Sequence, residues 1–224
     1  MMKRGILCFV LAAFLAVPAV AAAEVQGVYI APKFLLGIQN SGAMTTSGMG
    51  GVKPFKQYSQ AVFGGALAAG YNLAPQHGIP VRTEIEFALR SQADDKKNFA
   101  GGARAKQTTN LSTLFFNAYF DFDTGTPVTP YVGGGLGMAF NNSEFKINED
   151  VDRRKKSSHD TTFAWNLGLG AAYAVTENVA LDLGYRFVYT GYREVKMRDD
   201  TGAKMKFGSA PHIHEFILGA RFTF

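Results

Sequence analysis

The sequence predicts an all-β fold, an eight-stranded antiparallel up-and-down β-barrel that crosses a membrane, with short turns at one end and four long loops at the other. Three observations lead to this prediction. Apolar and polar residues alternate with a period of two in one segment after another, the apolar face is broad and aromatic, and the links between segments alternate between short and long. A strand that separates lipid from a polar lumen has this pattern and needs about 9 to 11 residues to cross.

The first 23 residues precede the predicted barrel. Two positive charges stand within residues 1–4, residues 5–17 form an apolar run, and small residues follow. This is the pattern of a secretory signal peptide, which we expect to be cleaved before Glu24 after export through the Sec pathway. The only cysteine, Cys8, lies in the apolar run, so disulfides and cysteine chemistry are excluded from the mature chain. Residues 24–224 have the length of one domain, the barrel.

Eight segments of the mature chain carry the alternation. In the third segment, Val81, Ile85 and Leu89 face away from Arg82 and Arg90. The sixth and seventh segments repeat this pattern, with aromatic residues and leucine on the wide face and with glycine or charge on the other. Segments of this kind that are bounded by turn residues are typical of β-strands. The predicted strands span residues 26–38, 59–72, 80–91, 108–121, 129–140, 161–174, 179–191 and 212–224.

Glycine is concentrated on the narrow face of three of these strands. Because glycine in a strand interior weakens the strand, its clustering there indicates close approach by neighbours. We expect these positions to leave room for long charged side chains that reach across the lumen. They are Gly64, Gly70, Gly133, Gly135, Gly137, Gly168 and Gly170.

The last predicted strand and three internal segments resemble a known family. Residues 111–122, 130–137 and 181–187 are similar to strands of the Opa-type opacity proteins and of the wider OmpA-like outer-membrane β-barrels. The resemblance implies a monomer in the outer membrane of a Gram-negative bacterium, in contact with membrane lipid and lipopolysaccharide. It also implies that the barrel-assembly machinery reads the apolar face of the closing strand as an assembly signal. That face carries Phe216, Leu218, Phe222 and Phe224.

The narrow faces of the strands carry a balanced set of charges, five positive and five negative. The interior of an eight-stranded barrel is just wide enough for side chains, and unpaired charges there would be costly. We therefore expect ion pairs that close the lumen, with Arg82, Arg186 and Arg221 opposite Glu84, Glu86 and Asp182. A small or gated pore and an active site with perturbed charges are the alternatives. The full inward set is Lys33, Arg82, Glu84, Glu86, Arg90, Asp121, Asp182, Arg186, Glu215 and Arg221.

The predicted outer loops hold most of the excess positive charge of the chain, which has a net charge of +5. The densest cluster is Arg153, Arg154, Lys155 and Lys156. Basic runs attract polyanions through their summed field, which makes this cluster a candidate site for lipopolysaccharide phosphate or for a host glycosaminoglycan or protein. Simple solvation of a loop is the alternative. Nucleic acid is not an expected partner outside the cell.

Catalysis and metal binding have few candidates. His214 and Glu215 are adjacent on a strand and point to opposite faces, so they cannot act together with Ser209 as a hydrolytic site. His212 and His214 share a face, but no carboxylate or thiol at matching spacing completes a metal site. We therefore expect no catalytic residues, no metal and no cofactor. The predicted function is that of a non-catalytic surface protein whose outer loops carry a structural or adhesive role; a small porin and a lipid A-modifying enzyme are the alternatives.

Overall fold

The computed structural model describes residues 26–40, 45–47, 59–91, 93–98, 104–148, 153–198 and 204–224. The predicted signal peptide, residues 1–23, lies outside these ranges, as does most of the predicted loop between the first two barrel strands. What is said below refers to the described residues.

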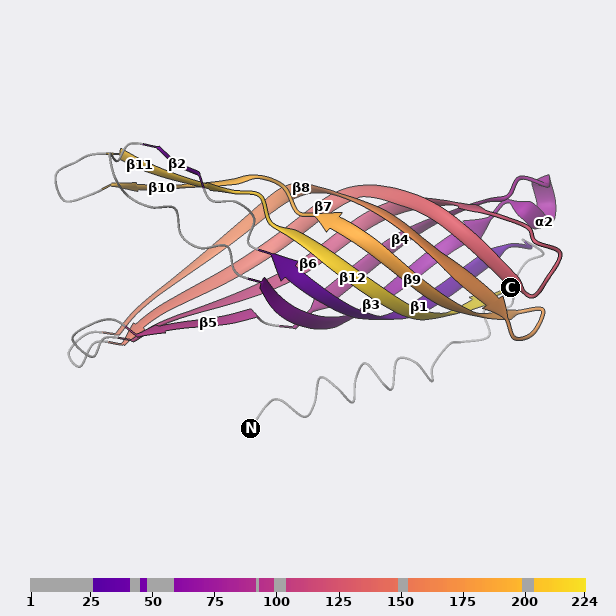
Figure 1. The fold of residues 1–224 in the computed structure, drawn as a ribbon, viewed down its shortest axis with the longest axis horizontal. Helices are drawn as coiled ribbons and strands as arrows, with labels where there is room; N and C mark the ends of the chain where they lie inside the picture. The colour runs from indigo at the N-terminus through magenta and orange to yellow at the C-terminus, as the bar shows by residue number, and fades with distance from the viewer. Residues whose placement is uncertain are drawn as a thin grey trace.

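Eight long strands form one closed antiparallel barrel (Figure 1). Each strand pairs with its neighbours along the chain, and the last barrel strand pairs with the first. This arrangement confirms the predicted eight-stranded up-and-down fold. The strands are β1 (Val28–Asn40), β3 (Ser59–Asn72), β4 (Val81–Arg90), β6 (Arg104–Asp121), β7 (Val128–Asn148), β8 (Arg153–Ala174), β9 (Val179–Tyr189) and β12 (His212–Thr223).

The register of the pairs gives the barrel a shear of ten residues. A path from each residue to its direct partner starts at Tyr29, runs once around the barrel, and returns to β1 at Gln39, ten positions further along. With eight strands, this offset sets the strand tilt and the width of the interior. Residues that meet across the lumen are therefore not those that occupy equivalent places in their strands.

The outer face and the lumen show the reverse of the residue distribution in a soluble protein, because apolar side chains are exposed and charged side chains are buried. Leu183 and Leu136 are 64% and 62% exposed, whereas Glu86 and Arg186 are 0% and 2% exposed. Large apolar side chains of all eight barrel strands are exposed in the same way. Such an apolar exterior is stable only when lipid surrounds it, and the buried charges are stable only when they pair with one another.

The strands are much longer than predicted at one end of the barrel, on the left of Figure 1. Strands β6, β7 and β8 continue into the predicted loops, so residues 141–160 extend the barrel as a hairpin around the undescribed residues 149–152. Strand β5 (Ala93–Asn98) pairs with the extension of β6. A second sheet of β10 (Arg193–Arg198), β11 (Lys204–Ser209) and β2 (Thr45–Ser47) lies at the same end. Three of the four predicted long connections are thus largely β-structure, and most of the first lies outside the described residues.

The opposite end of the barrel has short connections. One contains the four-residue helix α2 (Ala74–His77), which ends at Gly78 with a φ of 65°; another turns at Gly125, whose φ is 64°. Both angles lie in the left-handed region that glycine adopts without a steric penalty. No helix among the described residues is long and apolar enough to span a membrane. The contrast between the two ends is the expected layout of short periplasmic turns and long outer segments.

Candidate functional site

The lumen has an apolar outer part and a charged remainder. Seven buried side chains from six of the barrel strands pack together across the outer part, with Phe115 as the largest of them. The charged residues lie further toward the short turns, several of them on β1 and β4, which contribute nothing to this cluster. Because the inward charges dominated the sequence pattern, this apolar cluster was not predicted. It comprises Val62, Leu111, Phe115, Ala139, Ala164, Val188 and Ile213.

On the short-turn side of this cluster, a series of ion pairs crosses the middle of the lumen. Arg186 on β9 donates to Glu86 on β4 at 2.6 Å and to Glu215 on β12 at 2.7 Å. Arg90 donates to Glu215 at 2.5 Å. Lys33 on β1 donates to Glu86 at 2.7 Å and also contacts Glu84. Glu86 and Glu215 therefore each pair with two cations. This series of ion pairs joins four strands that are distant in sequence.

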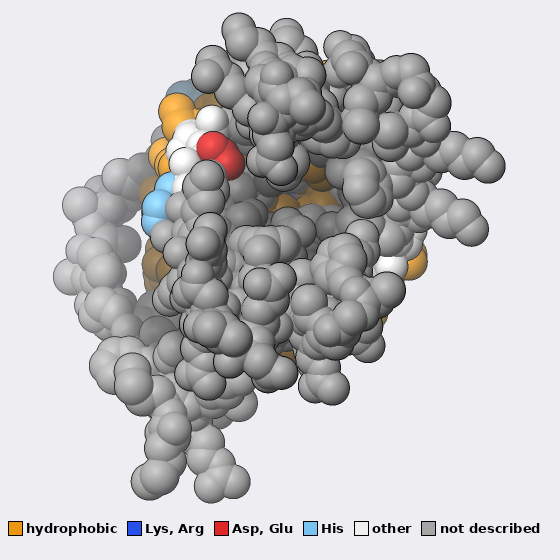
Figure 2. Space-filling model, turned by 90° about the vertical axis from the view of Figure 1, so that its left-hand side faces the viewer, with side chains coloured by type: hydrophobic (Ala, Val, Ile, Leu, Met, Phe, Trp, Pro, Cys, Tyr) orange, Lys and Arg blue, Asp and Glu red, His pale blue; other side chains and the backbone are white. Residues whose placement is uncertain are grey.

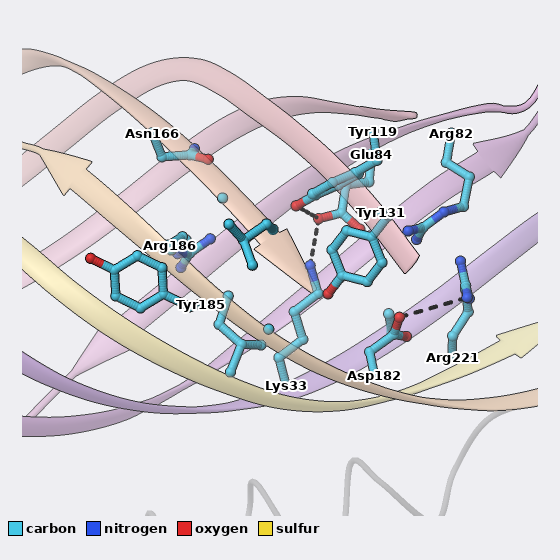
Figure 3. A pocket seen from close by; sticks show the side chains of 15 residues that line it. Lys33, Arg82, Glu84, Tyr119, Tyr131, Asn166, Asp182, Tyr185, Arg186 and Arg221 are labelled. Atoms are coloured by element: carbon cyan, nitrogen blue, oxygen red, sulfur yellow. Dashed lines mark hydrogen bonds and ion pairs between the residues drawn. The ribbon is translucent and has the colours of Figure 1, made fainter. Parts of the chain in front are cut away.

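Two further ion pairs lie nearer the short turns, and Figure 3 shows one of them. Arg82 donates to Asp121 at 2.6 Å, so its partner is not among the three carboxylates expected for it. The Arg82 guanidinium also lies 5.0 Å from the ring centroids of both Tyr119 and Tyr131. Arg221 and Asp182 are 3.6 Å apart, which is an ion pair without a hydrogen bond.

Three of the seven glycines of the narrow face make room for tyrosine rings. A Cβ atom at Gly70 would lie 2.3 Å from the ring of Tyr29, and one at Gly170 would lie 2.5 Å from the ring of Tyr131. Gly133 is related to Tyr119 in the same way, at 2.4 Å. The expectation of room for charged chains is met at Gly168, where the Cβ of Arg186 would be 2.9 Å away. These tyrosine rings fill the lumen beside the charged side chains. The sequence feature that could have predicted them is an inward tyrosine opposite an inward glycine on the neighbouring strand.

Among the described residues, the lumen holds a cavity of about 30 Å³, which has room for a few water molecules at most. Lys33, Arg82, Asp182 and Arg221 line it, with Tyr119 and Tyr131 (Figure 3). Arg82 Nη2 and Asp182 Oδ1 are buried and have no hydrogen-bond partner among the described residues. A polar cavity of this size gives ordered water a place to satisfy them, but it is too small for a solute.

We expect the purified, refolded protein to show no steady single-channel conductance in a planar bilayer. Ions would have to cross both the apolar cluster around Phe115 and the series of ion pairs. An unrelated closed barrel, refolded in the same way, provides the control for leakage. Reproducible conductance above that control would contradict a closed lumen and favour the porin alternative.

The candidate hydrolytic residues are separated by the barrel wall. Glu215 is buried in the lumen and is bound to Arg90 and Arg186. His214 is half-buried on the lipid side, where its Nδ1 lies 2.6 Å from the Tyr185 hydroxyl. The two residues therefore face different environments, as their adjacent positions on a strand predicted.

The basic cluster of the sequence forms the outer part of β8. The register pairs Arg153 with Asn148, Arg154 with Ile147, Lys155 with Lys146, and Lys156 with Phe145. Because residues alternate along a strand, Arg153 and Lys155 occupy one face of the sheet, and Arg154 and Lys156 occupy the other. The cluster is thus divided between two surfaces and is not a single basic loop.

Comparisons with known proteins agree with this architecture. The sequence matches the family model described as outer membrane protein beta-barrel domain over residues 7–224. The outer membrane protein PagN of Salmonella typhimurium is 31% identical over 183 residues, which cover 74% of each chain. A Rickettsia conorii protein provisionally named an adhesin is 24% identical over 174 residues, 73% of this chain and 68% of that protein. The crystal structure of the outer membrane protein OprG from Pseudomonas aeruginosa shares the fold, with a TM-score of 0.51 and 16% identity, over 88% of this chain and 96% of that chain.

These two relatives are named as an outer membrane protein and an adhesin, and neither name describes an enzyme. The match over almost the whole chain confirms the predicted resemblance to outer-membrane barrels and the location in the outer membrane of a Gram-negative bacterium. The chain belongs to the outer membrane protein β-barrel family.

Proposed function

We propose that this chain is a non-catalytic surface-interaction protein, which binds a polyanionic glycan with its outer strands as an adhesin would. The name of the Rickettsia conorii relative is in keeping with such a role. The filled lumen supports it as well, because it leaves the outer segments as the part of the protein that is accessible from outside the cell.

The observation that carries the proposal is a row of four lysines across four adjacent strands. Lys96 on β5 pairs directly with Lys106 on β6, Lys106 pairs with Lys146 on β7, and Lys146 pairs with Lys155 on β8. Neighbouring strands are about 4.8 Å apart, so the backbone positions of these four lysines fall within roughly 15 Å. Like charges directly opposite each other destabilise a sheet, and a bound polyanion would offset that repulsion.

Two arginines extend this lysine row on the same face. Arg104 on β6 and Arg153 on β8 both pair with Asn148 on β7, two positions beyond the lysines. Residues two apart on a strand share a face, so six basic residues take positions on one face of the sheet. Such a surface suits a linear glycan with repeated sulfate or phosphate groups better than a single small anion.

The lysine row stands well above the membrane. Leu114, Met138 and Phe163 are large exposed apolar residues on β6, β7 and β8, and the row lies eight residues further along each of these strands. At about 3.3 Å per residue this is about 26 Å along the strands. The row is therefore placed for a ligand that approaches or projects from the cell surface, and not for the headgroups of the bilayer.

A variant with glutamine at all four positions of the row, Lys96, Lys106, Lys146 and Lys155, is expected to bind heparin on the order of tenfold to a hundredfold more weakly. The reason is that four adjacent positive charges no longer contribute to the electrostatic field that attracts the polyanion. The measurement is binding of the reconstituted protein to immobilised heparin at two salt concentrations. Wild-type binding should weaken with salt more steeply than binding of the variant.

A variant with the same change in net charge provides the control. Neutralising Lys196, Arg198, Lys204 and Lys206 on β10 and β11 removes four charges outside the row and should cause the smaller loss. Replacing residues 153–156 with serine should give an intermediate loss, since two of those four lie on the row's face. Undiminished heparin binding by the lysine-row variant would contradict the proposal. Binding to lipopolysaccharide but not to heparin would assign the ligand to the bacterium's own surface.

A further inference from the structure

Seven rings form a continuous network on the outward face of β8, β9 and β12. Its centre is Phe187, whose ring centroid lies 5.5 Å from that of His212 and 5.3 Å from that of His214. The two imidazoles are 5.5 Å apart, edge to face. Trp165 joins the network through Phe187 at 5.6 Å, and contacts of Tyr189 and Phe216 extend it. The platform comprises Trp165, Tyr185, Phe187, Tyr189, His212, His214 and Phe216.

The platform has polar groups among its rings. The Tyr185 hydroxyl lies 2.6 Å from His214 Nδ1, and the two rings are stacked at 6.1 Å. This contact orients the His214 ring and leaves its Nε2 atom available to bind a ligand. Within the described part of the chain, neither imidazole has another hydrogen-bond partner. Both rings are half-buried, so they combine accessible nitrogen atoms with a fixed position.

The platform lies at the outer edge of the apolar belt. Tyr189 is the last residue of β9 and His212 is the first residue of β12, while Leu183 and Leu218, lower on the same strands, are 64% and 57% exposed. The belt on β3, β4 and β6 has no ring-to-ring contact at this edge among the described residues. Figure 2 looks onto this end of the barrel and shows hydrophobic side chains at its rim. Among the described residues, the ring contacts at this edge are confined to β8, β9 and β12.

We propose that this platform binds the phosphorylated amino-sugar headgroup of an outer-leaflet glycolipid. Sugar rings present C–H groups that pack against aromatic faces, and a phosphate oxygen accepts hydrogen bonds from imidazole N–H groups, most strongly when the imidazole is charged. Aromatic side chains with a polar edge suit the boundary between apolar and wet regions. The edge of the belt is where such a headgroup lies, about 26 Å along the strands from the lysine row. The inference rests on the outer-membrane location and is independent of glycan binding by that row.

Trp165 makes the platform directly observable, because it is the only tryptophan of the chain. We expect its fluorescence to change in a saturable way when the protein, refolded in phosphatidylcholine bilayers, is given lipid A. Dephosphorylated lipid A should bind more weakly, and phosphatidylglycerol should produce no saturable change. The double variant His212→Asn/His214→Asn should bind lipid A about tenfold more weakly, as expected for the loss of hydrogen bonds from the imidazole N–H groups to phosphate.

Two further variants separate the platform from general effects. His77→Asn alters a histidine in the short turn at the far end of the barrel and should bind lipid A like the wild type. Tyr185→Phe removes the hydroxyl that orients His214 and should give a partial loss. Wild-type affinity in the double histidine variant would overturn the inference, and so would an equal response to phosphatidylglycerol. Heparin binding should be unchanged in all of these variants, so failure here can be told apart from failure of the lysine-row proposal.

Discussion

Replacing Glu215 with glutamine is expected to lower the free energy of unfolding by about 3–5 kcal/mol, because it leaves buried charges without a partner. Glu215 is 1% exposed and accepts hydrogen bonds from both Arg90 and Arg186. In the variant, Arg186 keeps Glu86, but Arg90 retains only the hydroxyl of Thr113 at 3.1 Å. Unfolding by guanidinium in bilayers, followed by Trp165 fluorescence, would measure the change.

Two comparison variants make this result specific. Arg221→Gln removes a cation that lies 3.6 Å from its partner and makes no hydrogen bond to it, so it should cost less than the loss of Glu215, which accepts charge-assisted hydrogen bonds from two arginines. In Glu215→Gln/Arg90→Met the orphaned cation is removed together with the carboxylate, and much of the stability should return. If Glu215→Gln cost no more than Arg221→Gln, the central ion pairs would not stabilise the barrel.

The barrel was predictable from the sequence because lipid imposes a strict rule on every strand. Outward residues such as Leu183 and inward residues such as Arg186 alternate through the belt, and two of the three short turns contain a glycine. The outer extensions of β7 and β8 escape this rule because water meets both of their faces. Polar residues from Asn141 to Asp160 therefore show no contrast between faces and resemble a loop in sequence.

The members of the lumen network were predictable, but their partners were not. Alternation alone places Arg82 and Glu84 on the inward face. Which carboxylate meets Arg82 depends on the register between β4 and β6, which brings Asp121 to it, while Glu84 meets Lys33 of β1. For the same reason the sequence shows that His212 and His214 share a face, while their contact with Phe187 and Tyr185 follows from the register between β9 and β12.

Deleting Phe224 is expected to reduce the amount of assembled protein in the outer membrane several-fold. The structure supplies one reason: the Phe224 backbone N–H donates to the carbonyl of Val28 at 2.8 Å, and its carbonyl accepts from Gly27 at 3.2 Å. These bonds extend the pairing of β1 with β12, where the barrel closes. The resemblance to outer-membrane barrels implies a second reason, recognition of the aromatic side chain by the assembly machinery. Heat-modifiable mobility of the protein in isolated outer membranes would measure the assembled fraction.

The variant Phe224→Ala separates these two reasons, because it keeps both backbone hydrogen bonds and removes only the ring. If the ring is an assembly signal, Phe224→Ala should assemble poorly in cells but refold like the wild type in pure lipid bilayers, where no machinery is present. If the backbone pairing is what matters, the deletion should impair refolding in bilayers and Phe224→Ala should assemble normally in cells. Because the ring is 38% exposed and lies at the end of its strand, its loss should cost little stability, and we expect the first pattern. Normal assembly of both variants would show that neither the ring nor the final pair of hydrogen bonds is needed to close the barrel.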